Sequence, residues 1–169
     1  MTSSATISAC KRYRYTLHRS IPENAHLPLK PLLVIALNPS TAGETINDNT
    51  IRKLLEFGRL WGCTSLTVVN LFAFRTAYPT DLWAAQAAGV DIVGPENDHH
   101  LRAMISSHRD GIILAAWGAD KKAAKRSWEV CKLLPFFTTK CVARNKDGSP
   151  RHPLYVGYDE QLKPWIPAQ

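Results

Sequence analysis

Short apolar runs alternate with amphipathic segments along the chain. Four runs are rich in apolar and β-branched residues and are too short for a helix, which is typical of buried strands: 31–37, 65–72, 111–117 and 138–143. Four segments between or beside these runs repeat apolar residues at helical spacing: 51–61, 79–89, 95–105 and 120–134. In the last of these segments, the lysines are expected to face solvent and Trp128 the core.

Strands that alternate with helices imply right-handed crossovers and a mostly parallel sheet covered on both faces. The sequence therefore predicts a three-layer α/β/α fold around a four-stranded sheet, formed as a single domain by residues 1–169. Residues 1–30 are expected to be a basic N-terminal extension, in which Tyr13 to Leu17 alternates like an edge strand.

Composition excludes several protein classes. The 169 residues are 45% hydrophobic and 21% charged, as in a soluble domain, and no apolar stretch reaches the length of about eighteen residues that a membrane span needs. The N-terminus lacks the basic start and apolar block of a secretory signal. The four cysteines contain no Cys-x-x-Cys pair, so we expect no disulfide framework or zinc site, and a reduced cytoplasmic setting. A monomer without a cofactor and without membrane contact is expected.

The net charge of +7 is unevenly distributed. Residues 1–30 hold five Lys and Arg against one acid and residues 119–169 hold ten against five, whereas residues 31–118 hold six against eight. A basic excess at both ends of one domain predicts a face that meets a polyanion, with simple solubility as the alternative.

Two asparagines stand near the ends of predicted strands, where ligands bind in open parallel sheets. Asn38 precedes Pro39 directly after the first apolar run, so its amide is held at a rigid corner; it either orients a water or stabilises an Asx turn. Asn70 lies in a β-branched run, where its amide needs a partner. It either reads the edge of a nucleobase or bonds to neighbouring backbone.

Two titratable residues are candidates for catalysis. His152 follows the last predicted strand, where it either donates to negative charge on a leaving group or is an exposed loop residue. Asp48 is expected to cap the first helix, with general-base catalysis as the alternative. The sequence contains no glycine-rich dinucleotide motif, no P-loop and no Gly-x-Ser-x-Gly elbow, so those enzyme classes lose support.

The order of four motifs resembles the uracil-DNA glycosylase superfamily: Leu37-Asn38-Pro39-Ser40, Val68-Val69-Asn70, Leu114 to Ala119 with its Trp-Gly pair, and His152-Pro153-Leu154. A bacterial and phage family of unknown function is more closely similar, from about Tyr13 to Tyr158. The resemblance implies a uracil-DNA glycosylase-like fold and cleavage of an N-glycosidic bond without a cofactor.

The resemblance also implies roles for single residues. Asn38 is similar to the water-positioning amide of the mismatch-specific branch, Asn70 to the asparagine that binds the flipped base, and His152 to the histidine that stabilises the departing base anion. Leu154 or Tyr155 stands where a wedge residue enters the duplex. The family's activating aspartate is absent and the loop reads His-Pro-Leu-Tyr instead of His-Pro-Ser-Pro, so hydrolysis is expected to be slow or limited to a labile base. The cysteine spacings do not match the iron–sulfur branches, so no cluster is expected.

Further residues complete the expected site. Phe72 and Trp117 are candidate stacking surfaces for a base, with membership of the core as the alternative. Contacts to the DNA strand are expected from polar, basic and wedge residues: Ser40, Thr41, Arg75, Arg144, Lys146, Arg151 and Leu154. No metal site is expected, since His99-His100 has no third ligand in metal spacing.

The leading hypothesis is an N-glycosylase-like protein that excises a modified or damaged base from DNA by water attack at the glycosidic carbon. One alternative is a non-catalytic module that binds a base or nucleic acid. The other is an enzyme that acts on free, hypermodified nucleotides.

Overall fold

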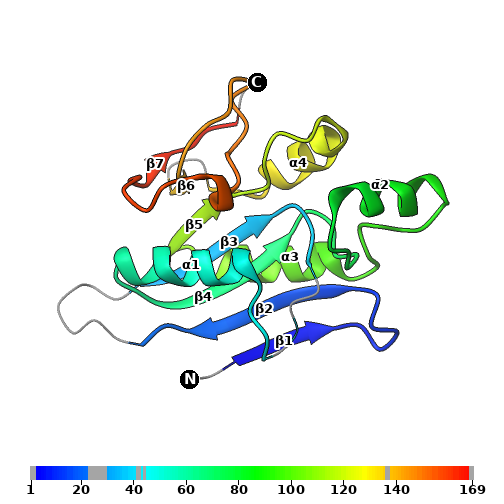
Figure 1. The fold of residues 1–169 in the computed structure, drawn as a ribbon, viewed down its shortest axis with the longest axis horizontal. Coiled ribbons are helices and arrows are strands. Elements are labelled where there is room, and N and C mark those ends of the chain that lie inside the picture. Colours follow the sequence, from blue (N-terminus) through cyan, green and yellow to red (C-terminus); the bar gives the residue numbers. More distant parts are fainter. Residues whose placement is uncertain (1–2, 23–29, 41–42, 44, 136–137, 168–169) are drawn as a thin grey trace.

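A seven-stranded sheet lies between two layers of helices in the computed structural model, which describes residues 3–22, 30–40, 43, 45–135 and 138–167 (Figure 1). Its strands are β1 (Ser3–Ile7), β2 (Arg14–Ser20), β3 (Lys30–Ala36), β4 (Cys63–Asn70), β5 (Ile112–Ala115), β6 (Thr139–Cys141) and β7 (Lys163–Pro164). Its helices are α1 (Asn49–Leu60), α2 (Pro79–Ala87), α3 (Asn97–Ser107) and α4 (Ala124–Cys131), with single 3₁₀ turns η1 (Lys121–Ala123) and η2 (Pro153–Tyr155).

The strand order is β1-β2-β4-β3-β5-β6-β7. The four central strands β4, β3, β5 and β6 are parallel and correspond to the four predicted ones, whereas β1, β2 and β7 pair antiparallel. The prediction of a four-stranded, mostly parallel sheet was therefore wrong in size and type, because the sheet is mixed and has seven strands. The two outermost strands carry little pattern: β1 is mostly small and polar, and β7 has two residues.

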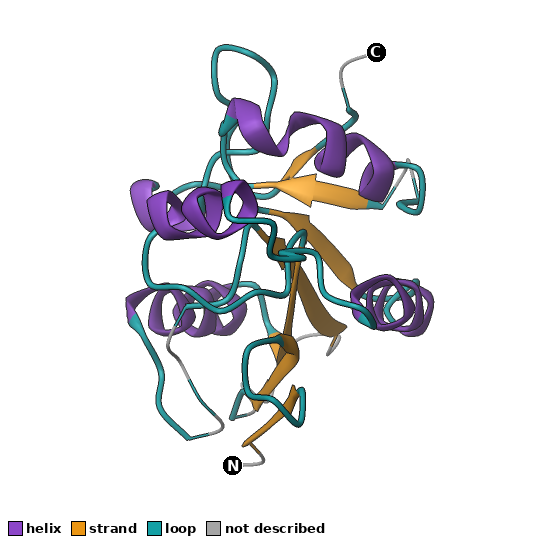
Figure 2. Cartoon of the chain, turned by 90° about the vertical axis from the view of Figure 1, so that its right-hand side faces the viewer, coloured by secondary structure: helices purple, strands orange, loops and turns teal. Residues whose placement is uncertain are grey.

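The α/β/α layering is confirmed by the two faces of β3. Leu33 and Ile35 pack in a cluster with residues of α2, α3 and α4, whereas Leu32 and Val34 pack in a second cluster with residues of α1. Figure 2 shows helices on either side of the strands. Burial on both faces explains why this strand is a continuous apolar run.

The fourth predicted helix, 120–134, is wrong in length and in orientation. It is split into η1 and α4, and Trp128 is 47% exposed instead of facing the core. Arg126 takes a place on the buried face, because its guanidinium is satisfied there: Nε donates to the Leu71 carbonyl oxygen at 2.9 Å, and Nη2 pairs with Asp98. A buried arginine with such partners cannot be distinguished from a surface arginine by sequence pattern.

The two basic ends of the chain lie at opposite edges of the sheet. β1 and β2 form one edge, and β6 and β7 form the other, near the bottom and the top of Figure 1. β2 is not an edge strand as predicted, because β1 pairs with it on the side away from β4. The topology therefore gives no support to the prediction that these two basic ends form a face that meets a polyanion.

In the part of the chain that the structure describes, no helix could cross a membrane. The four cysteines all belong to this part and form no disulfide; Cys10 is exposed, and Cys63, Cys131 and Cys141 are buried.

Candidate functional site

The carboxyl ends of three parallel strands meet at one edge of the sheet. β3 pairs with β4 so that Ala36 lies opposite Asn70, and with β5 so that Ile35 lies opposite Ala115. Asn38, two residues beyond β3, therefore leaves the sheet beside the end of β4. This is the edge at which open parallel sheets bind ligands.

Two adjoining cavities lie at this edge. The small cavity has a volume of about 50 Å³ and is lined by Arg14, Ala36, Asn38, Ser40, Asp48, Thr50, Ile51, Val68, Asn70 and His152. The large cavity, of about 300 Å³, shares four of these residues and is also lined by Thr76, Trp117, Gly118 and Tyr155, among others. The shared residues are Asn38, Ser40, Thr50 and His152. The structure thus brings together the two asparagines, the aspartate and the histidine that the sequence singled out.

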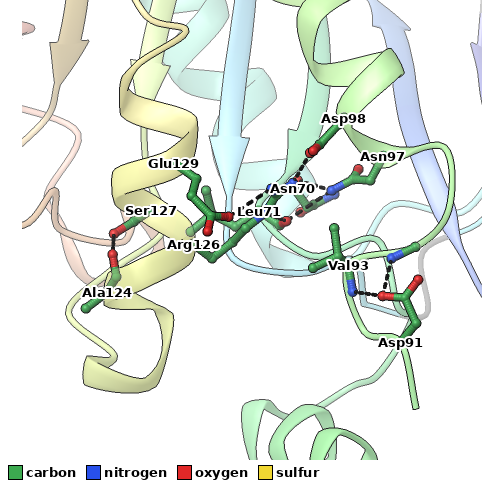
Figure 3. A network of polar contacts seen from close by, with 11 residues as sticks. Asn70, Leu71, Asp91, Val93, Asn97, Asp98, Ala124, Arg126, Ser127 and Glu129 are labelled. Carbon is green, nitrogen blue, oxygen red and sulfur yellow. Dashed lines mark hydrogen bonds and ion pairs between the residues drawn. The ribbon is translucent and has the colours of Figure 1, made fainter. Parts of the chain in front are cut away.

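The side chain of Asn70 is 1% exposed, and neither its nitrogen nor its oxygen has a hydrogen-bond partner among the residues that the structure describes. Its backbone is held firmly: the Nδ2 of the fully buried Asn97 donates to the carbonyl oxygens of Asn70 at 3.1 Å and Leu71 at 3.0 Å (Figure 3). The strand end is therefore fixed, while the amide retains its capacity to donate and to accept. A buried amide of this kind costs free energy unless a ligand or water bonds to it.

The amide of Asn38 is oriented by a residue that sequence reasoning missed. Its Nδ2 lies 3.0 Å from Thr76 Oγ1, 3.2 Å from the Thr76 carbonyl oxygen and 3.2 Å from that of Pro39. Thr76 Oγ1 donates in turn to the Tyr78 carbonyl oxygen at 3.1 Å, so it accepts from Asn38. Because the NH₂ group is engaged, the polar atom of Asn38 suited to a water is Oδ1, which accepts.

Asp48 combines its predicted capping role with a place in the small cavity. Its Oδ1 accepts from the backbone N–H of Ile51 at 2.8 Å and so caps α1, while Oδ2 accepts from Ser40 Oγ. Capping at this position satisfies a free backbone donor of the first turn. The carboxylate is thereby placed beside Asn38 and His152 at the cavity wall.

His152 is held by the turn that follows it. Its Nδ1 accepts from the backbone N–H of Leu154 at 3.3 Å, which in the neutral ring leaves the proton on Nε2 as a donor. Gly118 packs beneath it with a φ of 84°, a conformation that favours glycine, and an added Cβ would lie 3.9 Å from the His152 Cβ. The Trp-Gly pair thus turns the chain at the end of β5 next to the histidine.

Arg14 is a second residue of the site that sequence reasoning missed. It is 2% exposed, lines the small cavity with Asn70 and Asp48, and lies in a strand that the pattern placed at the sheet edge. The signal available was weak, since an arginine in an alternating strand is usually a solvent-facing residue.

A comparison with known families matches the part of the chain that forms this site. The model of the DUF1643 family, described as a protein of unknown function, matches residues 14–154. The chain belongs to the DUF1643 family. The matched segment contains every residue that lines the small cavity. No curated protein and no solved structure matches this chain, so the relation to the uracil-DNA glycosylase superfamily stays a prediction.

Several predicted site residues of the DUF1643 domain lie away from the small cavity. Phe72 is 3% exposed and packs edge-to-face on Trp83, at 5.3 Å between ring centroids, within the core. Trp117 lines the large cavity but is only 5% exposed and packs edge-to-face on Trp165 at 5.1 Å. Phe72 is therefore a core residue, whereas Trp117 is both a core residue and a cavity wall.

The predicted DNA contacts are dispersed over the DUF1643 domain. Arg75 Nη1 donates to the Lys11 carbonyl oxygen at 3.3 Å, and Arg144 Nη2 donates to the Pro164 carbonyl oxygen at 2.8 Å, beside β7. Lys146 and Arg151 are exposed, and Leu154 is 37% exposed next to His152. Thr41 lies outside the described residues.

The small cavity gathers polar side chains of several chemical types. Within the described ranges, no group of three or more His, Cys, Asp or Glu is arranged to hold a metal ion. The small cavity of the DUF1643 domain instead presents an amide without a partner, a second amide, a carboxylate, an imidazole and a guanidinium. These groups can bind a flat polar ring, orient a water and stabilise negative charge.

The titration of His152 is a first testable property. Burial lowers the pKa of its imidazole below the ordinary 6.5, and the Asp48 carboxylate opposes this effect. The unfolded chain, in which His152 has its ordinary pKa, binds the proton at a higher pH than the folded protein does. As the pH falls below 6.5 and through the lowered pKa, this histidine should therefore decrease the free energy of unfolding.

Titration of the ring protons of His152 by NMR is expected to give a midpoint below 6.5. The variant His152→Gln assigns the signal and should remove part of the acid-induced loss of stability. His100 and His108, whose pKa values burial also lowers, contribute to the loss that remains. A midpoint at or above 6.5 for His152 would show that its ring is not desolvated as the geometry indicates.

Proposed function

We propose that this DUF1643 protein binds a modified or damaged base of DNA at its two adjoining cavities and hydrolyses the N-glycosidic bond of that base. The observation that carries the proposal is the buried amide of Asn70, which lines the small cavity with both polar atoms unpartnered among the described residues. An amide donates and accepts side by side in one plane, and the edges of nucleobases present the complementary pair.

The sizes of the cavities suit a ring that enters edge first. The small cavity, at about 50 Å³, has room for a few water-sized groups, hence for the edge of a ring next to Asn70. The large cavity, at about 300 Å³, is of the size of small ligand sites and is open to the rest of a nucleotide. The shared wall of Asn38 and His152 would then lie near the bond between base and sugar.

The remaining groups match the needs of glycosidic cleavage. The transition state carries positive charge on the sugar and negative charge on the base, so the site needs a water on one side and hydrogen-bond donors on the other. Asn38 Oδ1 and Asp48 can accept from that water, and His152 Nε2 can donate to the base. Base flipping would bring the base out of a duplex, with the exposed Leu154 and Tyr155 beside the cavity.

The proposal is tested by incubating the protein with duplexes that contain uracil, hydroxymethyluracil, hypoxanthine or hypermodified pyrimidines. Abasic sites are expected with at least one of these substrates. Asn38→Ala should lose cleavage by about 100-fold or more while it retains binding, because it removes the group that orients the water. The variant Arg102→Gln, an exposed substitution on α3, serves as the matched control. No abasic sites across the panel, with a working positive control enzyme, would contradict the proposed activity.

Two observations favour other functions, which the same incubation would distinguish. Both oxygens of Asp48 already accept hydrogen bonds, from Ile51 and Ser40, which favours a module that binds bases without hydrolysis. Salt-sensitive DNA binding without abasic sites would identify that module.

The basic ends lie at opposite edges of the sheet, which favours a free nucleotide over DNA. Turnover of mononucleotides with no affinity for oligonucleotides would identify that enzyme.

A further inference from the structure

Two further cavities continue from the large cavity along the end of β5 to the outer face of α4. The nearer one, of about 160 Å³, shares four lining residues with the large cavity: Trp117, Gly118, Ala119 and Asp120. The farther one, of about 240 Å³, shares five lining residues with the nearer one: Trp117, Ala124, Ser127, Asp147 and Ser149. We call these two adjoining cavities the aromatic groove. Trp117 lines both of them and the large cavity, so the groove begins at the proposed base site.

The far part of the aromatic groove is lined by three tryptophans, of which one is open to solvent. Trp117 and Trp165 are buried and pack edge-to-face, and Trp165 Nε1 donates to the Gly148 carbonyl oxygen at 3.1 Å. Trp128 is 47% exposed, which is unusual for so large an apolar ring. The groove therefore ends at an aromatic surface that the described part of the chain leaves largely uncovered.

Basic residues surround the aromatic groove. Residues 119–151, which supply most of its lining, hold nine Lys and Arg against three acids. Lys132 Nζ lies 5.9 Å from the centroid of the Trp128 ring, and Lys121 lines the nearer cavity. Both lysines are exposed. An excess of positive charge beside an open aromatic ring is complementary to a ligand that carries both phosphates and flat rings.

The three acids of this segment are engaged within the protein. Asp120 Oδ1 accepts from the backbone N–H of Lys122 at 2.9 Å, and its Oδ2 accepts from Trp83 Nε1 at 2.8 Å. Asp147 Oδ1 accepts from the hydroxyl and the backbone N–H of Ser149, at 2.6 and 3.0 Å. Glu129 pairs with the buried Arg126. The exposed lysines therefore set the sign of the charge beside the groove.

We propose that the aromatic groove binds an unpaired nucleotide of single-stranded DNA, whose base stacks on Trp128 while the neighbouring lysines contact its phosphates. Proteins hold single strands by this combination of aromatic surfaces and basic residues. A base inside a duplex has both faces covered by its neighbours, so only an unpaired base can stack on an indole. A single strand also needs only this basic edge of the sheet, and not the basic end at the opposite edge.

The inference rests on the proposed function in one respect, because it takes the large cavity as the site of the target base. The nucleotide in the aromatic groove then belongs to the same strand, on the far side of Trp117 from His152. The preferred substrate of the proposed activity is accordingly a strand with unpaired bases next to the target, and not a fully paired duplex.

The test measures binding without cleavage. The probe is a labelled oligothymidylate of about eight nucleotides, which carries none of the modified bases of the cleavage assay. Fluorescence anisotropy gives its affinity at several salt concentrations, and the same strand annealed to its complement is the duplex probe. The unlabelled single strand should in addition quench the tryptophan fluorescence of the wild type, whereas the duplex should not.

Trp128→Ala should lower the affinity for the single strand about tenfold, as the loss of one stacked base does, and leave duplex binding unchanged. Its salt dependence should stay that of the wild type, because the stacked ring carries no charge. Trp128→Phe keeps an aromatic ring and should restore most of the affinity, but without the quenching. Conversely, Lys132→Gln should reduce the slope of log affinity against log salt by about one.

Tyr158→Ala is the matched control. Tyr158 is also 47% exposed, but it packs on Phe57 of α1 in the opposite helix layer, at 5.2 Å between ring centroids. This variant should bind the single strand as the wild type does. Thermal unfolding checks the fold of each variant; alanine favours helices, so Trp128→Ala is expected to stay folded.

Three results would overturn the inference: no binding of the single strand by the wild type, unchanged affinity in Trp128→Ala, or equal losses for single strand and duplex. A dimer that Trp128→Ala converts to a monomer, with unchanged affinity for the strand, would assign the aromatic groove to a second copy of the chain. If Trp128→Ala does not fold, the quenching decides, and its absence in the wild type would overturn the inference.

Failure of this inference is distinguishable from failure of the proposed function. If the single strand binds through Trp128 and no abasic sites form in either kind of DNA, the aromatic groove stands and the glycosylase activity falls. If abasic sites form and Trp128→Ala changes neither cleavage nor binding of the single strand, the proposed function stands and the role of the aromatic groove falls.

Discussion

Replacing Asn70 with leucine is expected to weaken base binding strongly while the fold stays at least as stable as the wild type. The side chain is 1% exposed and has no partner among the described residues, so its removal breaks no hydrogen bond within that part of the protein. A buried, unsatisfied amide costs about 1–3 kcal/mol, part of which Asn70→Leu should recover as a gain of about 1 kcal/mol. The loss of two hydrogen bonds to the base should weaken binding by about 100-fold.

The stability of Asn70→Leu is measured by chemical denaturation, in which the dependence of the free energy of unfolding on denaturant concentration should equal that of the wild type. Its binding is measured by titration with free bases. A residue with a purely structural role would give the opposite result for stability. A loss of more than about 1 kcal/mol in Asn70→Leu would therefore contradict the assignment of this amide to ligand recognition.

The same substitution at the neighbouring buried asparagine is expected to have the opposite effect. Asn97 is fully buried, and its Nδ2 donates to the carbonyl oxygens of Asn70 and Leu71 (Figure 3). Asn97→Leu deprives the Asn70 carbonyl of this donor, whereas the Leu71 carbonyl still accepts from Arg126 Nε. The expected loss of stability is about 1–2 kcal/mol, because the lost hydrogen bonds are inaccessible to water, while removal of the unpartnered Asn97 Oδ1 offsets part of this loss.

Asn97→Leu should also weaken base binding, because the end of β4 that carries Asn70 loses its support. Denaturation of Asn97→Leu and Asn70→Leu under the same conditions makes each variant the matched control of the other. Equal changes in stability for the two variants would show that the hydrogen bonds of Asn97 do not hold this strand end.

The central part of the fold could be predicted because its signals are local. Three of the four parallel strands, β3, β4 and β5, are rich in apolar and β-branched residues, since both of their faces are buried. The start of α1 was marked by Asp48, whose capping bond to Ile51 involves residues three apart. The meeting of Asn38, Asn70 and His152 followed from one topological rule, that the carboxyl ends of parallel strands share an edge.

The remaining features depend on contacts between distant parts of the chain. The short edge strands β1 and β7 form by pairing with neighbours and carry no apolar run of their own. Arg126, and not Trp128, lies on the core side of α4. Its guanidinium bonds there to Asp98 and to the Leu71 carbonyl oxygen, which are far away in sequence. Phe72 follows a strand end just as the site residues do, yet the position of Trp83 makes it part of the core.

The sequence by itself determined the alternation of strands and helices, and with it the edge of the sheet where polar side chains gather, because both follow from the periodicity of apolar residues. Only the tertiary structure decided which polar side chains are satisfied there. Thr76 takes up the amide hydrogens of Asn38, while the amide of Asn70 stays without a partner in the described chain and the charge of Arg14 is buried beside it. Hydrogen bonding and desolvation depend on all atoms within a few ångströms, and the chain order does not reveal which atoms those are.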